Sequence, residues 1–320
     1  MHSFSFRTAV RHGLAVSALL TLGALTACGG SSSHSSVTEG SEDRLLVLTD
    51  DNAPAVVQMS SATADMAPEL LFLFIMYGFE NGNLGCLNEP EGSSDLETDG
   101  NRPLRVAFND CQVEDYSDLD SRLNGSLEFV FDTPSPDSPF LLTMTGYEMK
   151  SIDTLNGYHE ETLRGNGQVK VTPSANILIS SLNDFNGELF ISRVEGVGDD
   201  REESVFRWTF RDYQLGATEG TLGPEYVTLD GHLGFGAPLN GEVALTTHVP
   251  LHYENGPGDG CPSAGDITAN GGEGTSVNLL FASDDEILVT LNGVTETFNC
   301  QDFQNWLNAT PVPFSARIGR

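Results

Sequence analysis

Two histidines and a glutamate late in the sequence carry the clearest metal-ligand pattern. His248 and His252 are four residues apart, and Glu254 follows two residues later. In a regular strand such positions share one face, so the imidazoles and the carboxylate could approach one zinc ion. Pro250 lies between the histidines and indicates an edge strand or a bulge. Two surface histidines in a hairpin are therefore the simpler interpretation, and zinc is the alternative.

Carboxylates are abundant, and their clusters raise two further possibilities. Calcium needs several oxygen ligands around one ion, often from a D-x-D-x-D-G loop, and the sequence has no such loop. Solvated turns are the default interpretation, and calcium is the weaker alternative. A carboxylate pair for glycan hydrolysis is also conceivable, but no pair stands out among 46 acidic residues. The clusters lie at Asp50-Asp51, Asp95 with Asp99, Asp115 with Asp118 and Asp120, Asp199-Asp200, and Asp284-Asp285-Glu286.

Four of the five cysteines indicate disulfide chemistry. Cys86, Cys111, Cys261 and Cys300 form an even set that allows three pairings. We favour Cys86–Cys111 and Cys261–Cys300, because each pair closes a local loop and because Cys111 and Cys300 both follow a Phe-Asn step. The sequence contains no C-x-x-C, so a metal or redox site is the minor alternative.

The remaining cysteine closes an N-terminal export signal. Arg7 and Arg11 form a short basic head, residues 13–25 are apolar, and Leu25-Thr26-Ala27-Cys28 follows. This tetrapeptide resembles the lipobox of bacterial lipoproteins. The resemblance implies that residues 1–27 are removed and that Cys28 carries a diacylglyceryl thioether and an amide-linked acyl chain, which together anchor a protein firmly. An ordinary cleavable signal is the alternative.

The residues after Cys28 predict where the protein resides. Gly29 stands where an Asp would imply retention at the inner membrane in enterobacterial-type lipoproteins, so the resemblance implies the outer membrane, on its periplasmic or surface face. Residues 28–43 are Gly-, Ser- and acid-rich, which predicts a flexible tether. The β-rich domain is expected over residues 44–320, with a possible small disulfide-stapled unit at 255–320.

The charge balance excludes two classes of partner. The chain has 15 basic and 46 acidic residues and a formal net charge of −31. Nucleic-acid binding through phosphate neutralisation needs a basic face, and docking on anionic lipid needs a polybasic patch. Neither nucleic acid nor an anionic lipid surface is therefore an expected partner.

The elements that must position these residues are mostly strands. An apolar run at residues 70–77 predicts one buried helix, capped at Ser60, Ser61 or Thr63 and ended by a turn at residues 81–83. From residue 105 onward, alternation of apolar and polar residues predicts about ten to twelve short strands. The fold class is therefore all-β: an antiparallel meander forming a curled sheet, a sandwich or an open barrel around one N-terminal helix.

Asn-Gly and Asp-Gly steps recur between the apolar runs. Both residues of such a step tolerate positive φ, so each step is typical of a tight hairpin turn. A five-residue pattern recurs: an apolar residue, then Asn or Asp, then Gly, then any residue, then an apolar residue. We interpret this pattern as a repeated hairpin. This form occurs at residues 123–127, 185–189, 229–233 and 239–243. The layout weakly resembles uncharacterised β-rich envelope lipoproteins of proteobacteria.

These patterns favour an outer-membrane-anchored lipoprotein with a non-enzymatic binding or envelope-structural role. Its expected partners are the membrane, through the lipid anchor, and an unidentified protein or glycan. The first alternative is a carrier of an apolar ligand, which an open apolar cavity would favour and a fully packed interior would oppose. The second is a glycan hydrolase. The sequence has no G-x-S-x-G, H-E-x-x-H or P-loop motif, so no catalytic residue or cofactor is assigned.

Overall fold

The computed structural model describes most of the chain after the expected tether. The described residues are 45–100, 102–116, 119–135, 138–154, 158–174, 179–197, 200–219, 224–254, 260–283 and 285–309. The expected signal, the tether and Cys28 lie outside these residues.

One antiparallel sheet of thirteen strands dominates the fold, slightly more than the ten to twelve expected. Each strand pairs with its neighbours in sequence, so the sheet is a simple meander that stays open between β1 and β13. The strands are β1 (Ser93–Asp99), β2 (Arg102–Tyr116), β3 (Leu119–Phe131), β4 (Phe140–Asp153), β5 (Tyr158–Pro173), β6 (Ile179–Val197), β7 (Asp200–Glu219), β8 (Pro224–Phe235), β9 (Gly241–His252), β10 (Ala264–Asn270), β11 (Ser276–Ser283), β12 (Glu286–Leu291) and β13 (Val294–Phe298). Strands β10–β13 continue the same sheet.

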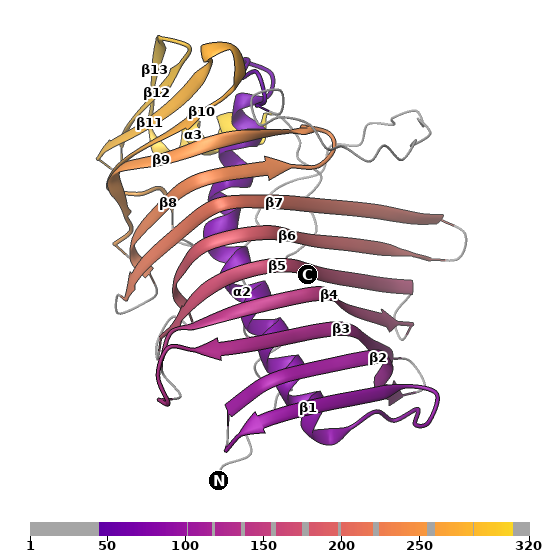
Figure 1. Ribbon diagram of the computed structural model, residues 1–320. Coiled ribbons are helices and arrows are strands. Elements are labelled where there is room, and N and C mark those ends of the chain that lie inside the picture. Colours follow the sequence, from indigo (N-terminus) through magenta and orange to yellow (C-terminus); the bar gives the residue numbers. More distant parts are fainter. Residues whose placement is uncertain are drawn as a thin grey trace.

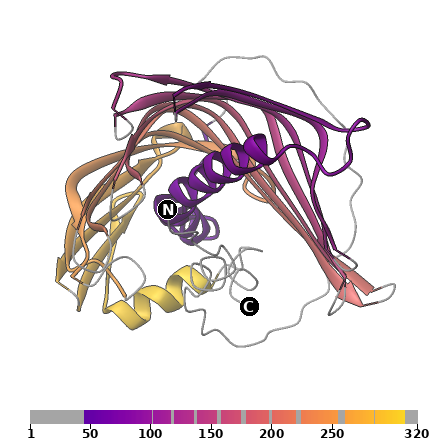
Figure 2. The same ribbon diagram turned by 90° about the horizontal axis from the view of Figure 1, so that it is seen from below.

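A long helix, α2 (Ala53–Leu84), lies along the concave face of the sheet and crosses most of its strands (Figures 1 and 2). The helix is longer at both ends than predicted. It begins after Asn52 with a proline in its first turn and ends at Gly85, whose φ of 80° stops it. The predicted caps and the predicted turn at residues 81–83 are therefore wrong. Residues 58–65 are mostly small and polar, so they give little apolar periodicity to reveal the helix.

Large side chains on the second half of α2 hold it against the sheet. Leu71 and Phe74 are completely buried, and the Phe74 ring meets the Tyr147 ring edge-on, with 5.1 Å between centroids. In the first half of α2, the hydroxyl groups of Thr63 and Tyr213 share a hydrogen bond of 2.9 Å. Burial raises the pKa of both tyrosines above the usual value, so they stay neutral. Among the described residues, α2 alone is long and apolar enough to cross a bilayer, and its place in the core accounts for that composition.

The recurring Asn-Gly and Asp-Gly steps mostly lie inside strands, not in hairpin turns. Asn124-Gly125, Asn166-Gly167, Asn186-Gly187 and Asp230-Gly231 fall within β3, β5, β6 and β8. All seven strand pairings from β2 to β9 contain a register shift. We call this line of shifts the bulge seam. The hairpin interpretation is thus wrong for three of the four repeats, at residues 123–127, 185–189 and 229–233, and for Asn166-Gly167. The fourth repeat, residues 239–243, does lie at the connection between β8 and β9, where Asn240 has positive φ. Asn292-Gly293 likewise turns between β12 and β13 with positive φ at both residues.

The side chain of each seam Asn or Asp satisfies a backbone amide freed on the neighbouring strand. Asn124 Oδ1 accepts a hydrogen bond of 2.8 Å from Asp110 N, and Asn186 Oδ1 accepts one of 3.0 Å from Asp212 N. Both donating residues have positive φ, near 50°. Asp230 Oδ1 likewise accepts from Thr247 N at 2.9 Å. Because bulges bend strands and increase their twist, the seam accounts for the curl of the sheet around α2 (Figure 2).

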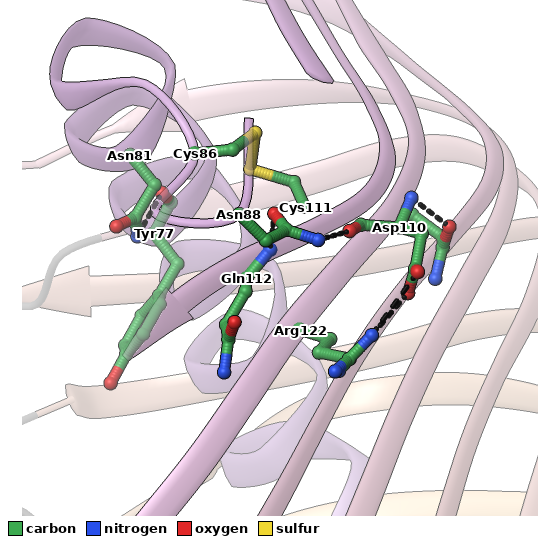
Figure 3. The surroundings of a disulfide bond; sticks show 9 residues. Tyr77, Asn81, Cys86, Asn88, Asp110, Cys111, Gln112 and Arg122 are labelled. Atoms are coloured by element: carbon green, nitrogen blue, oxygen red, sulfur yellow. Dashed lines mark hydrogen bonds and ion pairs between the residues drawn. A yellow bond between two sulfur atoms is a disulfide. The ribbon is translucent and has the colours of Figure 1, made fainter. Parts of the chain in front are cut away.

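Both favoured disulfides are present. Cys86–Cys111 ties the chain just after α2 to β2, and Asn88 reinforces this junction by bonding Asp110 O and Gln112 N, each at 2.9 Å (Figure 3). Cys261–Cys300 ties the chain before β10 to a second helix, α3 (Cys300–Asn308), which the sequence analysis did not predict.

Candidate functional site

An apolar cavity of about 390 Å³ lies beside the first half of α2, whereas the Cys86–Cys111 bond lies just beyond the other end of that helix. The first half of α2 forms one wall, strands β8–β11 form the floor, and α3 covers one side. The lining residues are Val57, Gln58, Ser60, Ser61, Ala62 and Ala64 from α2; Leu229, Leu245, Leu251, Tyr253, Gly260, Pro262, Ile267, Ala269, Val277, Leu279 and Phe281 from the sheet and its loops; and Phe303, Gln304 and Leu307 from α3.

Strand register explains the apolar floor. Leu245, Ala269 and Val277 are direct partners across β9, β10 and β11, and alternation sends all three to the concave face. Ile267 and Leu279 form the next such row. All five are buried, so the floor is a continuous aliphatic surface.

The cavity exists because the side chains that α2 turns toward the sheet are large in its second half and small in its first half. Its second half inserts Leu70, Leu71 and Phe74 into the sheet, and these side chains fill the space there. The first half presents small side chains instead, such as Ser61 and Ala64. Small residues cannot reach the curved sheet, so the same curvature that encloses a packed core at one end leaves room at the other.

Two oxygen atoms in the cavity wall have no partner. Gln58 Oε1 and Ser60 Oγ are both shielded from solvent and make no hydrogen bond to any described residue. Ser60 is only 6% exposed. Buried polar groups are nearly always hydrogen-bonded, because leaving one unpaired costs on the order of 1–3 kcal/mol. Both atoms are inaccessible to a water-sized probe, so they do not face the cavity and a ligand there would not contact them in this structure.

Helix α3 is fixed over the cavity at several points. Asn299 caps it by accepting a hydrogen bond of 2.8 Å from Asp302 N. Phe303 is buried and meets Phe281 of the cavity floor edge-on at 5.8 Å. The disulfide Cys261–Cys300 holds the first turn, so α3 is attached both covalently and through its apolar face.

The predicted metal ligands do not come together. His248 is exposed and contacts Thr268 Oγ1 at 3.2 Å, whereas His252 bonds Ser263 Oγ at 2.8 Å and stacks on Tyr226. Within the described part of the chain, no three His, Cys, Asp or Glu side chains are grouped as a metal site would require. That holds for the zinc candidates His248, His252 and Glu254 and for the described members of the acidic clusters. Asp118, Asp199 and Asp284 lie outside the described residues, and the side chains of Asp115 and Asp200 are not described either.

The residues in the first half of α2 that line the cavity are the ones that sequence reasoning missed. The available signal was the change from a Ser-, Thr- and Ala-rich stretch at residues 58–65 to the apolar run at residues 70–77. Only the position of the sheet shows that this change leaves a cavity.

Removing the Cys261–Cys300 bond is expected to loosen α3 selectively. A Cys261→Ala/Cys300→Ala variant should lose about 3–4 kcal/mol of unfolding free energy in the chain-entropy model. Its amides at residues 300–309 should also exchange faster with solvent, as measured by hydrogen–deuterium exchange. Cys86→Ala/Cys111→Ala is the matched control, with a similar loss of stability and no faster exchange in α3. Equal α3 exchange in both variants would show that the bond does not hold the helix.

The chain matches no known family model, and comparisons with curated proteins and with solved structures found no significant match. The cavity and the disulfide-bonded helix α3 over it are therefore the features that bear on function.

Proposed function

We propose that this protein is an outer-membrane-anchored lipoprotein whose β-rich domain binds an apolar ligand in the cavity beneath α3. The observation that carries the proposal is the cavity itself: about 390 Å³, with aliphatic and aromatic side chains on most of its wall. Ligand sites are typically concave, mostly apolar and roughly 300–1,000 Å³ in volume, with a few polar groups that orient the ligand. This is the carrier role that the sequence left as an alternative to a purely structural one.

The chemistry of the wall favours binding over catalysis. None of the twenty described residues that line the cavity is charged. Glycan hydrolysis needs a pair of carboxylates at the reaction site, and this cavity supplies none. Burying an apolar chain is instead favourable by roughly 25 cal/mol for each Å² removed from water. The cavity thus suits a ligand that gains from leaving water and undergoes no reaction.

A lipid anchor at Cys28 would keep the cavity close to a source of apolar molecules. A flexible tether over residues 28–43 has a root-mean-square reach of about 20–24 Å. The domain would therefore remain near the membrane surface while free to reorient. The net charge of −31 opposes direct contact with anionic lipid, so the anchor rather than the domain surface would provide attachment.

Lipid attachment is expected to depend on Cys28 alone. In intact cells, the Cys28→Ala variant should lose incorporation of labelled fatty acid and should leave the membrane fraction, because no basic surface substitutes for the acyl chains. Fractionation and metabolic labelling measure both effects. A Cys28→Ala protein that stayed membrane-bound and lipid-labelled would contradict the anchoring proposal.

Ligand binding is tested on the chain from residue 28 onward carrying Cys28→Ser, which needs no detergent. All cavity residues lie between Val57 and Leu307, so this chain contains the whole site. A fluorescent apolar probe should bind with one site per chain, and native mass spectrometry should detect a co-purified apolar molecule released by organic solvent. Absence of both the saturable site and the co-purified molecule would refute the carrier function.

A further inference from the structure

We infer that the cavity takes a single lipid chain directly from the bilayer that anchors the domain, at the end of the domain where the expected tether joins it. This inference rests on the proposed carrier function and names the source of the ligand. It is carried by residues 45–48, which precede α2 and fix the point where the tether leaves the domain. We call this segment the strap.

Backbone hydrogen bonds attach the strap to the ends of several strands. Leu46 N donates to Glu242 O at 2.8 Å, and Leu46 O accepts from Gly272 N at 2.9 Å. Leu48 N donates to Thr275 Oγ1 at 2.9 Å, and the Leu48 side chain is buried. The strap is therefore joined to β9 and to the connection between β10 and β11.

The fit of the strap against these strand ends is close. A β-carbon at Gly271 would lie 2.2 Å from Leu46 O, so only glycine lets the two backbones approach this far. On the far side of the connection, the Asn292 side chain donates from Nδ2 to Leu48 O at 3.0 Å. The point where the tether meets the domain is thus fixed by contacts with four strands and their turns.

The strap lies at the same strand ends as the cavity floor. Ala269 is two residues before Gly271 on one strand, and Val277 is two residues after Thr275 on the next. At about 3.3 Å per residue, both floor residues lie roughly 7 Å along their strands from the strap contacts. Helix α2 begins five residues after the strap, and Val57 in its second turn already lines the cavity.

The opposite end of the domain lies much farther from the strap. Helix α2 has 32 residues and is therefore about 48 Å long. It begins beside β9–β11 and ends beside β1 and β2, where Gly82 approaches Leu96 and Val106 (Figure 1). The expected tether reaches about 20–24 Å, half of that length. Even as the domain reorients about the strap, its cavity end therefore stays nearer the bilayer on average than its β1 end.

This proximity suits the chemistry of the cavity. A chain that crosses water exposes its apolar surface at a cost of roughly 25 cal/mol for each Å², so a short path from bilayer to cavity lowers the barrier to transfer. The cavity volume of about 390 Å³ is near the lower end of the roughly 300–1,000 Å³ usual for ligand sites, which suits one chain and not a whole two-chain lipid.

The test moves the anchor from one end of the domain to the other. In the chain from residue 28 onward, the Cys28 thiol is coupled to a maleimide lipid in phosphatidylcholine vesicles. In the Cys28→Ser/Thr98→Cys variant, the same lipid is coupled at position 98, which is exposed on β1, through a spacer of similar reach, about 20 Å. The vesicles also contain a lysophosphatidylcholine whose chain carries a photoreactive diazirine. Illumination at successive times followed by peptide mass spectrometry measures how fast this chain reaches the cavity.

Anchor position is expected to change the rate of uptake and not its final extent. At equilibrium the lipid has one chemical potential throughout the sample, so final occupancy should be equal in the two proteins. The initial rate of crosslinking to cavity peptides should be several-fold higher with the anchor at Cys28. Equal initial rates, or no crosslinking in either protein, would overturn the inference.

The fluorescent apolar probe separates this inference from the carrier function. Both proteins should bind the probe equally before coupling, which shows that the Thr98→Cys change leaves the fold intact. Glu97→Cys offers a second exposed attachment point on β1 if that variant folds poorly. Probe binding together with equal lipid uptake rates would leave the carrier function standing without the inference, whereas absence of probe binding in the Cys28→Ser chain would refute the carrier function itself.

Discussion

The Gly167→Ala variant is expected to lose roughly 2–5 kcal/mol of unfolding free energy, a large effect for one added methyl group. Gly167 has a φ of 117°, which L-residues rarely adopt, and such left-handed conformations cost roughly 1–2 kcal/mol. A β-carbon there would lie 2.2 Å from Asn186 O and 2.4 Å from Gly187 Cα. Backbone atoms on β6 would have to move, and such overpacking costs a further ~1–3 kcal/mol.

Gly146→Ala is the matched control for this effect. Gly146 lies in the same bulge seam, also has positive φ, at 54°, and has no atom within 4 Å of the position that a β-carbon would occupy. Its expected loss is the conformational cost alone, about 1–2 kcal/mol. Denaturant titrations of both variants give the two free energies. Equal losses would show that the close approach of β5 to β6 at Gly167 is not rigid.

The difference between the two glycine variants bears on the cavity, because the bulge seam determines how strongly the sheet curls. If strands β5 and β6 separate at Gly167 and Gly187, the bend that curls the sheet around α2 weakens. The cavity depends on that curl, since its floor lies on strands β8–β11 of the same sheet. A destabilised seam should therefore also reduce ligand affinity, even though Gly167 does not line the cavity.

The seam also shows what the sequence could and could not predict. Period-2 alternation correctly indicated an antiparallel meander, because exposure alternates along strands such as β10 and β11. The recurring form marks a repeated local structure, but three of its four members lie inside strands and only residues 239–243 lie at a connection between strands. An Asn-Gly step supplies positive φ equally well in a two-residue turn and in a bulge, so only the strand pairing decides between them.

The cavity was less predictable for a different reason. Residues 58–65 carry no apolar stripe, and their Ser and Thr residues suggested the start of the helix at a place where the helix already continues from Ala53. The space beside them depends on how far the sheet curves and on α3, which begins at Cys300 and packs on Phe281 through Phe303. Residues 58–65 and α3 are separated by more than 200 residues in the chain, and local patterns cannot report how they come together.

The second large effect is expected from filling the cavity. Ala269 is buried on β10, lies between Leu245 and Val277 in the floor and faces the ligand space. In Ala269→Phe, the benzyl group should occupy volume that the ligand needs, so binding of the fluorescent apolar probe should fall more than tenfold. Stability should hold or rise by about 0.5–2 kcal/mol, because filling a cavity adds contacts without removing any. This opposite response of binding and stability distinguishes a blocked site from a damaged fold.

Ala282→Phe controls for the added aromatic ring, since Ala282 is exposed on β11 and does not line the cavity. It should bind the probe as the parent chain does.

Ala64→Leu adds a smaller group from the α2 side and should weaken binding with little strain. This variant still tests the site if Ala269→Phe packs poorly. Thermal melting and probe titration of the three proteins measure both quantities. If Ala269→Phe and Ala64→Leu were as stable as the parent and bound the probe with undiminished affinity, the ligand site would have to lie elsewhere, because two bulky groups from opposite walls cannot share this volume with a ligand.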